Sequence, residues 1–333
     1  MSILVIATEP ALLVARGSSR WVVEEHLKGE SPESLAVDPE TPTRVYCGTW
    51  GHGLWRSDDA GRTWEPAGAG IAHPEITAVA VSRSEHGVVY AGTEPSSVFR
   101  SEDAGQTWTD LSGLRELPSS RSWSFPPRPE THHVRWIETD PTAAGRVFVA
   151  IEAGALVRTL DGGRTWLDRV EDGPYDTHTA ATHPLAPGRV YSAAGDGYFE
   201  TRDAGEHWSS EVEGLRHHYV VGVAVDPADP DAVLVSAASG PYLAYSPSRA
   251  EAYVYRKAGR RSFEPAMEGL PGGRGTIASR FATLAGEPGV VYAANNHGVF
   301  RTPDAGRTWA SLEIPWPRGA FAHRVEALIC VPE

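Results

Sequence analysis

Ser57-Asp-Asp-Ala-Gly-Arg-Thr-Trp64 is the stretch that decides the fold. The pattern Ser/Thr-x-Asp-x-Gly-x-Thr-Trp recurs in four further copies, one of which has His in place of Thr. The further copies are residues 101–108, 159–166, 201–208 (the His variant) and 302–309. Self-similarity at a spacing of roughly 40–50 residues is the signature of a repeat architecture.

Each copy has the chemistry of a tight turn. The Asp can accept hydrogen bonds from backbone N–H groups two or three residues on, and the Gly allows a positive φ. The Thr favours a following strand, and the Trp anchors that strand by burying its ring. We therefore interpret the five Asp residues as turn formers and the five Trp residues as core anchors, not as catalytic groups.

The repeat resembles the Asp-box, or BNR repeat, of sialidases, xyloglucanase-type glycoside hydrolases, the sortilin ectodomain and photosystem II assembly factors. The resemblance covers nearly the whole chain. It implies a β-propeller in which each box joins the third and fourth strands of a blade, away from the ligand face. It implies little about function, because one fold carries many activities.

Every unit reads as four short strands, and amphipathic helix periodicity is absent. The full units are residues 31–66, 75–110, 131–170, 176–213, 218–268 and 276–313. Residues 3–27 supply only three strands, and residues 323–331 supply the missing one. We predict an all-β, seven-bladed β-propeller of four-stranded antiparallel blades in one domain, residues 1–333, closed by N- and C-terminal strands that share a blade. Six blades is the alternative, if the unit 218–268 is an insertion.

Two stretches interrupt the period, residues 111–130 and residues 240–257. The first is rich in Pro and the second in Tyr and Ala. Long loops in compact folds are commonly functional. Trp123 and Phe125 favour an ordered first insertion that docks on the ring.

Composition limits the partners. The 333-residue chain has a net charge of −13, so neither nucleic acid nor an anionic membrane is expected to bind it. The start of the chain lacks a signal-peptide pattern and no apolar run reaches membrane-spanning length, which predicts a cytoplasmic protein, taken as a monomer. Cys47 and Cys330 lie in apolar strand patterns and are expected to be buried free thiols.

In propellers, the loops that enter the innermost strands and the loops between second and third strands build the ligand face. Alignment of the inner strands places mostly ionisable residues at this mouth of the channel. These are Ser31, Glu33, Glu75, Thr77, His133, Arg135, Asp176, His178, Tyr219, Val221, Ala278, Arg280, Arg324 and Glu326. The second loop set adds Trp50, His52, Glu94, Glu152, Asp196, Asn295, Asn296 and His297.

We interpret this face as a pocket of acids, histidines and arginines for a small anionic or sugar-like ligand, although a propeller mouth is wet and polar in any case. The candidate catalytic residues are His133, His178, Glu94, Glu152, Asp196 and Tyr219. The candidate ligand-binding residues are Arg135, Arg280, Arg324, His218, His52 and His297. Histidine suits acid–base chemistry near neutral pH, and arginine suits carboxylate or phosphate oxygens.

The reaction and any cofactor stay open. A divalent metal could lie between His132-His133 or His217-His218 and Glu94, Glu152 or Asp196, but tight ligand spacing such as HExxH is absent. The arginines, with Tyr219 and Glu33, partly resemble the sialidase site, yet the Phe/Tyr-Arg-Ile-Pro motif is missing.

Paired acids such as Glu94 and Glu152 could serve glycoside hydrolysis, and elimination is the other reaction considered. The xyloglucanase-type enzymes have two tandem propellers. The alternative function, of another class, is a non-catalytic scaffold that binds a partner protein on the same face. An enzyme is expected to bury these charges in a cleft, and a scaffold to present them on a broad rim.

Overall fold

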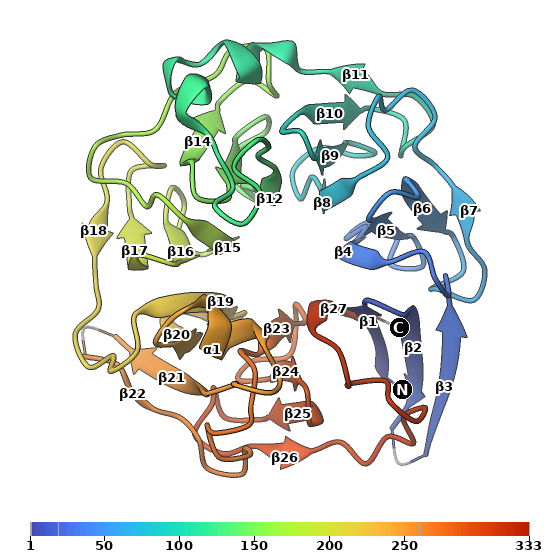
Figure 1. Cartoon of the computed structure of the whole chain (residues 1–333), viewed down its shortest axis with the longest axis vertical. Coiled ribbons are helices and arrows are strands. Elements are labelled where there is room, and N and C mark those ends of the chain that lie inside the picture. The colour runs from blue at the N-terminus through green and yellow to red at the C-terminus, as the bar shows by residue number, and fades with distance from the viewer. Residues whose placement is uncertain (1, 19, 260, 333) are drawn as a thin grey trace.

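The computed structural model describes residues 2–18, 20–259 and 261–332, which form seven antiparallel sheets arranged as a ring (Figure 1). The closing blade has the strand order β27-β1-β2-β3. Its strands are β1 (Ser2–Thr8), β2 (Ala11–Gly17), β3 (Trp21–His26) and β27 (Val325–Val331). Ile3 pairs with Val331 and Ala7 with Ala327, so the two ends of the chain share one sheet. The prediction of a seven-bladed ring closed by both termini is confirmed.

The other blades follow in chain order. The next two are β4 (Pro32–Val37), β5 (Val45–Thr49), β6 (Leu54–Ser57) and β7 (Glu65–Pro66), then β8 (Ile76–Val81), β9 (Val89–Thr93), β10 (Val98–Ser101) and β11 (Thr109–Asp110). After the blade that begins with β12, which is described below, comes the blade of β15 (Thr177–Thr182), β16 (Val190–Ala194), β17 (Gly197–Thr201) and β18 (Ser209–Ser210). The next blade consists of β19 (Tyr219–Asp226), β20 (Asp229–Ala238), β21 (Ala252–Ala258) and β22 (Glu264–Pro265). The last one before the closing strand consists of β23 (Arg280–Thr283), β24 (Val291–Asn295), β25 (Gly298–Thr302) and β26 (Ala310–Ser311). The sheet β19–β22 is a complete blade, so the six-bladed alternative is wrong.

One blade departs from the predicted four strands. It consists of β12 (Val134–Thr139), β13 (Val147–Ile151) and β14 (Ala155–Thr159). Its outer strand is reduced to a bridge between Arg158 and Leu167. The next residue, Asp168, accepts a 2.8 Å hydrogen bond from the backbone N–H of Ser119, so the first insertion takes the place of a longer ladder.

The repeated turns have the predicted chemistry. In the third copy, Asp161 accepts hydrogen bonds from Thr159 Oγ1 (2.9 Å) and from the backbone N–H of Thr165 (2.9 Å). In the fourth copy, His207 Nδ1 lies 2.8 Å from Asp203 and replaces the missing Thr hydroxyl. The expectation of buried Trp anchors needs correction, because only Trp208 and Trp309 are buried. The other three, Trp64, Trp108 and Trp166, are half-buried.

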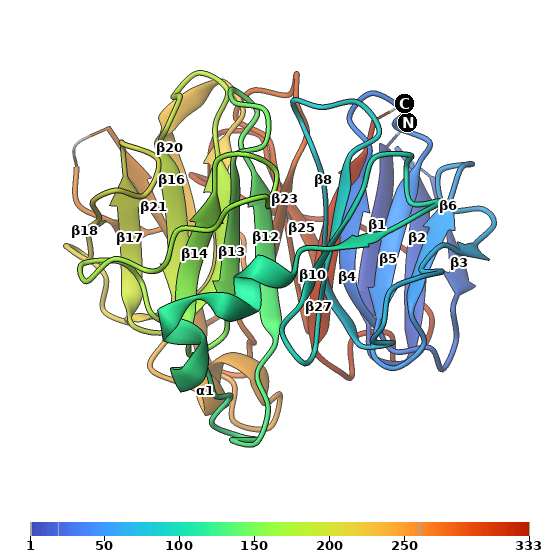
Figure 2. The same cartoon turned by 90° about the horizontal axis from the view of Figure 1, so that it is seen from above.

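Both insertions lie on one face of the ring and project beyond it (Figure 2). The first contains the short 3₁₀ helices η1 (Ser112–Glu116) and η2 (Pro118–Ser122), and the second contains α1 (Pro241–Tyr245). Trp123 is buried with Leu114 and Leu117 in the core of the three-stranded blade.

Other expectations concern single residues and the membrane. Cys47 and Cys330 are free and buried. In the described residues, no helix has the length and apolar character needed to cross a membrane. Ser19 and Arg260 lie outside the described residues.

Candidate functional site

The inner strands β4, β8, β12, β15, β19, β23 and β27 surround the central channel (Figure 1). At one end of the channel lies a cavity of about 610 Å³, which we call the mouth cavity. It is lined by Glu33, Trp50, Phe125, Arg128, His133, Arg135, Glu152, Tyr245, Arg324 and Glu326, among others. A narrower cavity of about 220 Å³ continues along the channel past His178 and Arg280.

Three arginines predicted to bind the ligand come together here. Arg135 is buried, and its Nε lies 3.2 Å from Glu152 Oε2. Arg324 pairs with Glu326 and lies 4.0 Å from Glu33. Arg135 lies near the start of β12, and Arg324 lies just before β27, two positions further out in the strand alignment. Because residues two apart on a strand point to the same side, register brings both side chains to the same end of the channel.

Arg280 differs from the other two because no carboxylate of the described residues forms an ion pair with it. It is 5% exposed, and its Nε donates a 3.3 Å hydrogen bond to the carbonyl of Val325. Its Nη2 is buried and has no hydrogen-bond partner in the described part of the chain. Burial, followed by the charge of Arg135, lowers the pKa of Arg280 to about 10. An incompletely compensated cation therefore lies at the mouth.

His133 sits between two of the predicted acids. Its Nε2 lies 2.8 Å from Glu152 and its Nδ1 3.5 Å from Glu94, which also pairs with Arg128 at 2.8 Å. Burial alone would raise the pKa of Glu152, but the hydrogen bond from His133 and the charge of Arg135 hold it well below its usual range. Glu152 is thus an ionised acceptor and not a proton donor.

A second acid pair, Glu33 and Glu326, lies on the neighbouring strands β4 and β27. Burial, together with the charge of Glu326, raises the pKa of Glu33 to about 7, against the attraction of Arg324. Glu33, with its raised pKa, and Glu152, with its lowered pKa, both line the mouth cavity, which is the arrangement that acid–base chemistry needs.

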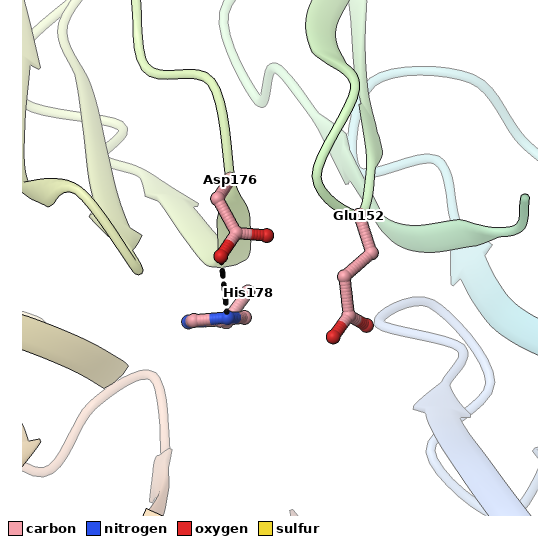
Figure 3. Close-up of side chains that lie close together, drawn as sticks. All are labelled: Glu152, Asp176 and His178. Atoms are coloured by element: carbon pink, nitrogen blue, oxygen red, sulfur yellow. Dashed lines mark ion pairs between the residues drawn. The ribbon is translucent and has the colours of Figure 1, made fainter. Parts of the chain in front are cut away.

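His178 is fully buried and its Nδ1 donates a 2.7 Å hydrogen bond to the carbonyl of Val220. Its Nε2 faces Asp176 Oδ2 at 3.5 Å, and Glu152 lies on the other side (Figure 3). The Tyr219 ring lies 4.8 Å from the imidazole. Burial, followed by the effects of Tyr245 and Asp176, raises the pKa of Tyr219, so this phenol stays protonated.

Of the twelve predicted site residues, four line the mouth cavity, namely His133, Arg135, Glu152 and Arg324. His178 and Arg280 line the narrower cavity, and Glu94 and Tyr219 contact His133 and His178. The remaining four lie outside both cavities. Asp196 is exposed and accepts backbone hydrogen bonds from Tyr175 and Asp176 (3.1 and 3.2 Å), which is a loop-forming role. The others are exposed histidines with local partners, namely His52 with Glu30 (3.0 Å), His218 with the carbonyl of Leu215 (3.1 Å) and His297 with the carbonyl of Gly275 (3.1 Å).

Of the two His-His pairs in the metal hypothesis, only His133 meets the named acids, since it contacts Glu94 and Glu152. The ring of His132 packs edge-on against Trp123, with a 5.7 Å centroid distance. His217 stacks on Tyr253 at 4.4 Å and hydrogen-bonds the hydroxyl of Tyr255. Aromatic neighbours in the insertions and in β21 thus hold both rings away from the channel.

Among the cavity residues that were not predicted, Arg128 and Tyr245 come from the two insertions. Arg128 lies over the rings of Trp50 (4.6 Å) and Phe125 (5.4 Å). Tyr245, at the end of α1, lies under Arg324 at 5.1 Å, and its buried hydroxyl has no partner among the described residues. The excess of Tyr in residues 240–257 was the only sequence signal for the second of these.

The fold and the site define a seven-bladed β-propeller with a buried, charged cavity at one mouth of its channel. Among solved structures, the chain is similar to the GH74 enzyme of Niastella koreensis, with a TM-score of 0.72 and 16% identity over 93% of this chain and 52% of that one. It is also similar to YCF48 bound to D1 peptide, with a TM-score of 0.57 and 17% identity over 84% and 82%. YCF48 from Cyanidioschyzon merolae gives a TM-score of 0.58 and 13% identity over 85% of each chain.

These likenesses show the fold alone, because every identity is low. The chain spans about half the length of the GH74 enzyme that it matches. No protein-family model matches the chain, and no curated protein matches it.

Proposed function

We propose that the mouth cavity binds a small polyhydroxy compound that bears a carboxylate or phosphate, such as a sugar acid. The observation that carries this proposal is Arg280, a buried guanidinium with an unpartnered Nη2 in the narrower cavity that continues from the mouth cavity, where a second buried arginine, Arg135, lines both cavities. Burying a charge without a partner is costly, and an oxyanion would supply the missing acceptor.

The size and lining of the cavity support the same ligand class. Its volume of about 610 Å³ falls in the range of small-molecule sites. The charges lie inside a cavity instead of on a broad rim, since Arg135, Arg280, His178 and Glu326 are all at least nine-tenths buried. Depth favours a ligand pocket over a scaffold surface.

For a hydrolysis or elimination, Glu33 is the proposed proton donor. Its pKa of about 7 keeps part of the carboxyl protonated near neutral pH, whereas Glu152 is ionised. The predicted pair Glu94 and Glu152 is less suitable for glycoside hydrolysis, because His133 lies between the two carboxylates and contacts both. His133, His178 and Tyr219 remain proposed as groups that orient the ligand or transfer its protons.

Calorimetry with glucuronate, inorganic phosphate and glucose tests the binding proposal. We expect glucuronate or phosphate to bind and glucose, which lacks the charge, to bind much more weakly. Arg280→Met should weaken anion binding at least about tenfold, since it removes a charge-assisted contact. Arg202→Ala, an exposed arginine next to a repeated turn, is the control and should bind normally. Unchanged anion binding in Arg280→Met, or no anion binding by the parent, would contradict the proposal.

A second candidate function is the binding of a partner protein by the same face. The two insertions project beyond the ring there (Figure 2), and Tyr242 on α1 is 71% exposed. The chain also matches most of the length of YCF48, one structure of which is bound to a peptide. A peptide that Arg280→Met still binds and Tyr242→Ser does not would assign this function to the insertions.

As to context, we propose that the ring is a single domain that acts as a monomer. The cytoplasmic location stays a prediction.

A further inference from the structure

We propose that Glu152, which lines the mouth cavity, binds one divalent transition-metal ion together with Asp176 and with His178, which lines the narrower cavity. One possible ligand atom from each residue lies within 4.8 Å of those of the other two. Figure 3 shows the three side chains converging from the end of β13 and the start of β15. One imidazole and two carboxylates suit Mn²⁺, Fe²⁺ or Zn²⁺.

The state of His178 is the second, independent observation. The side chain is 0% exposed, and its Nδ1 donates to the carbonyl of Val220 at 2.7 Å. In the neutral ring this bond fixes the tautomer, so Nε2 carries a lone pair directed at the acids. This Nε2 is buried and has no hydrogen-bond partner within the described ranges. Metal-binding histidines are held in this way, with the second nitrogen donating to a carbonyl or carboxylate.

The two carboxylates are also held in place by their other contacts. Asp176 Oδ1 accepts a 2.8 Å hydrogen bond from the backbone N–H of Ala153, which leaves Oδ2 facing His178. Glu152 contacts His133 and Arg135 through Oε2. Each acid is therefore oriented by one oxygen and keeps the other, as in metal sites with a supporting outer shell.

A second cluster shows why spacing alone is not sufficient. Asp203, Glu206 and His207 meet the same distance condition, but all three are exposed. His207 is already hydrogen-bonded to Asp203 as part of the repeated turn. This cluster carries no metal proposal and provides a matched control.

Three protein ligands would leave open coordination positions on the ion. Glu152 and His178 both line the cavities at this end of the channel, so these positions would face a bound ligand. The charges of two carboxylates, Arg135 and a divalent ion sum to a net positive value, which would attract an oxyanion or a hydroxyl oxygen. The metal proposal does not depend on the sugar-acid proposal, because the metal alone is the probe in its test.

The test is calorimetric titration of the full, chelator-treated chain with Mn²⁺ and with Zn²⁺. We expect one ion per chain, and we expect His178→Gln and Asp176→Asn each to lower the affinity at least about tenfold. His207→Gln should bind as the parent does. Melting of each variant without metal identifies any that fail to fold.

Anomalous diffraction from crystals of the parent soaked in Mn²⁺ locates the ion even if both pocket variants unfold. A peak among Glu152, Asp176 and His178 supports the site. The proposal is overturned if the parent binds neither ion, if the peak lies only elsewhere, or if His207→Gln rather than His178→Gln removes binding.

Discussion

Two buried clusters of charge, at opposite ends of the strands, differ in how completely they are paired. Glu200, just before the fourth repeated turn, is 1% exposed and accepts hydrogen bonds from Arg189 (2.7 and 3.1 Å), Tyr198 (2.8 Å) and Lys257 (3.2 Å). At the mouth, Arg280 is as deeply buried and donates to a single carbonyl.

The difference separates structure from function. A buried charge whose hydrogen bonds are all made within the protein holds neighbouring blades together. A buried charge with an unused donor costs free energy in the unliganded protein and is retained where a ligand completes it. The Glu200 cluster belongs to the first kind, and Arg280 belongs to the second.

The largest expected effect comes from breaking the ring on which both clusters depend. Removal of the last ten residues, 324–333, deletes Arg324 and the whole of β27, which pairs with β1 and carries Glu326 of the mouth. It exposes the edge of β1 and opens the ring. We expect loss of cooperative thermal unfolding. A truncated chain that melts as the parent does would refute closure by shared termini.

Removing the charge of Glu200, the centre of the fully paired cluster, should be strongly destabilising. Glu200→Gln replaces the carboxylate shared by Arg189 and Lys257 with an amide and leaves each buried cation only a partly exposed partner, Asp231 or Glu211. We expect a loss of about 3–5 kcal/mol in the free energy of unfolding. The control is Glu264→Gln, which removes an ion pair with Arg256 from a side chain that is 62% exposed. That change should cost less than about 1 kcal/mol. Equal losses in denaturant melts would remove the distinction between closed and exposed pairs.

At the mouth, pH gives the next largest effect. The pKa of Glu33 rises from 4.5 to about 7 on folding, so the folded state binds more protons than the unfolded state between these values. Stability contributed by this group is therefore present below about pH 4.5 and is lost as pH rises to 7, by at most about 3 kcal/mol.

Glu33→Gln mimics the protonated acid at every pH. The variant should melt above the parent at pH 8 and close to it at pH 4.5, in thermal scans at both values. A parent and variant whose difference does not change with pH would show that Glu33 titrates normally.

Removing the charge of Arg280 should stabilise the protein, whereas removing the charge of Glu200 should destabilise it. Arg280→Met replaces a poorly compensated buried charge by an apolar side chain of similar length, and we expect a gain on the order of 2 kcal/mol in denaturant melts. The same variant should lose anion binding. Destabilisation comparable to that of Glu200→Gln would mean that Arg280 is a structural member of the ring.

The sequence predicts the structure of those parts of the chain that follow the blade repeat and the two-residue period of the strands. Five turns in register fix the blades, and an inner strand places every second side chain on one face, so Glu33, Arg135, His178 and Arg280 could be assigned to one mouth. Strand register cannot predict Arg128 or Tyr245. Their insertions fall outside the period, and packing of Trp123 and α1 against the ring decides where they lie.

The conformation of the loops at the mouth is the second feature that the sequence could not predict. Asp196, His52, His218 and His297 lie on loops at the mouth face, but a loop has no two-residue period to orient its side chains. Each of these residues bonds to a group of its own or a neighbouring loop and stays exposed. Which acid has the high pKa was equally beyond the sequence, because it depends on burial and on which cation is nearest.

The smallest expected effect comes from a repeated turn, whose Asp is hydrogen-bonded within the protein but lies near solvent. Asp161→Ala removes the acceptor for Thr159 Oγ1 and for the N–H of Thr165, at the rim opposite the mouth. Because this carboxylate is near solvent, water replaces part of what is lost, and we expect about 1 kcal/mol of destabilisation. Anion and metal binding should match the parent, since every group of the mouth cavity keeps its strand. Calorimetry and denaturant melts on the same sample check both parts. Weaker binding with an unchanged melt would place a functional site on the turn face, and the contrast between paired and unpaired charge would then no longer divide the molecule.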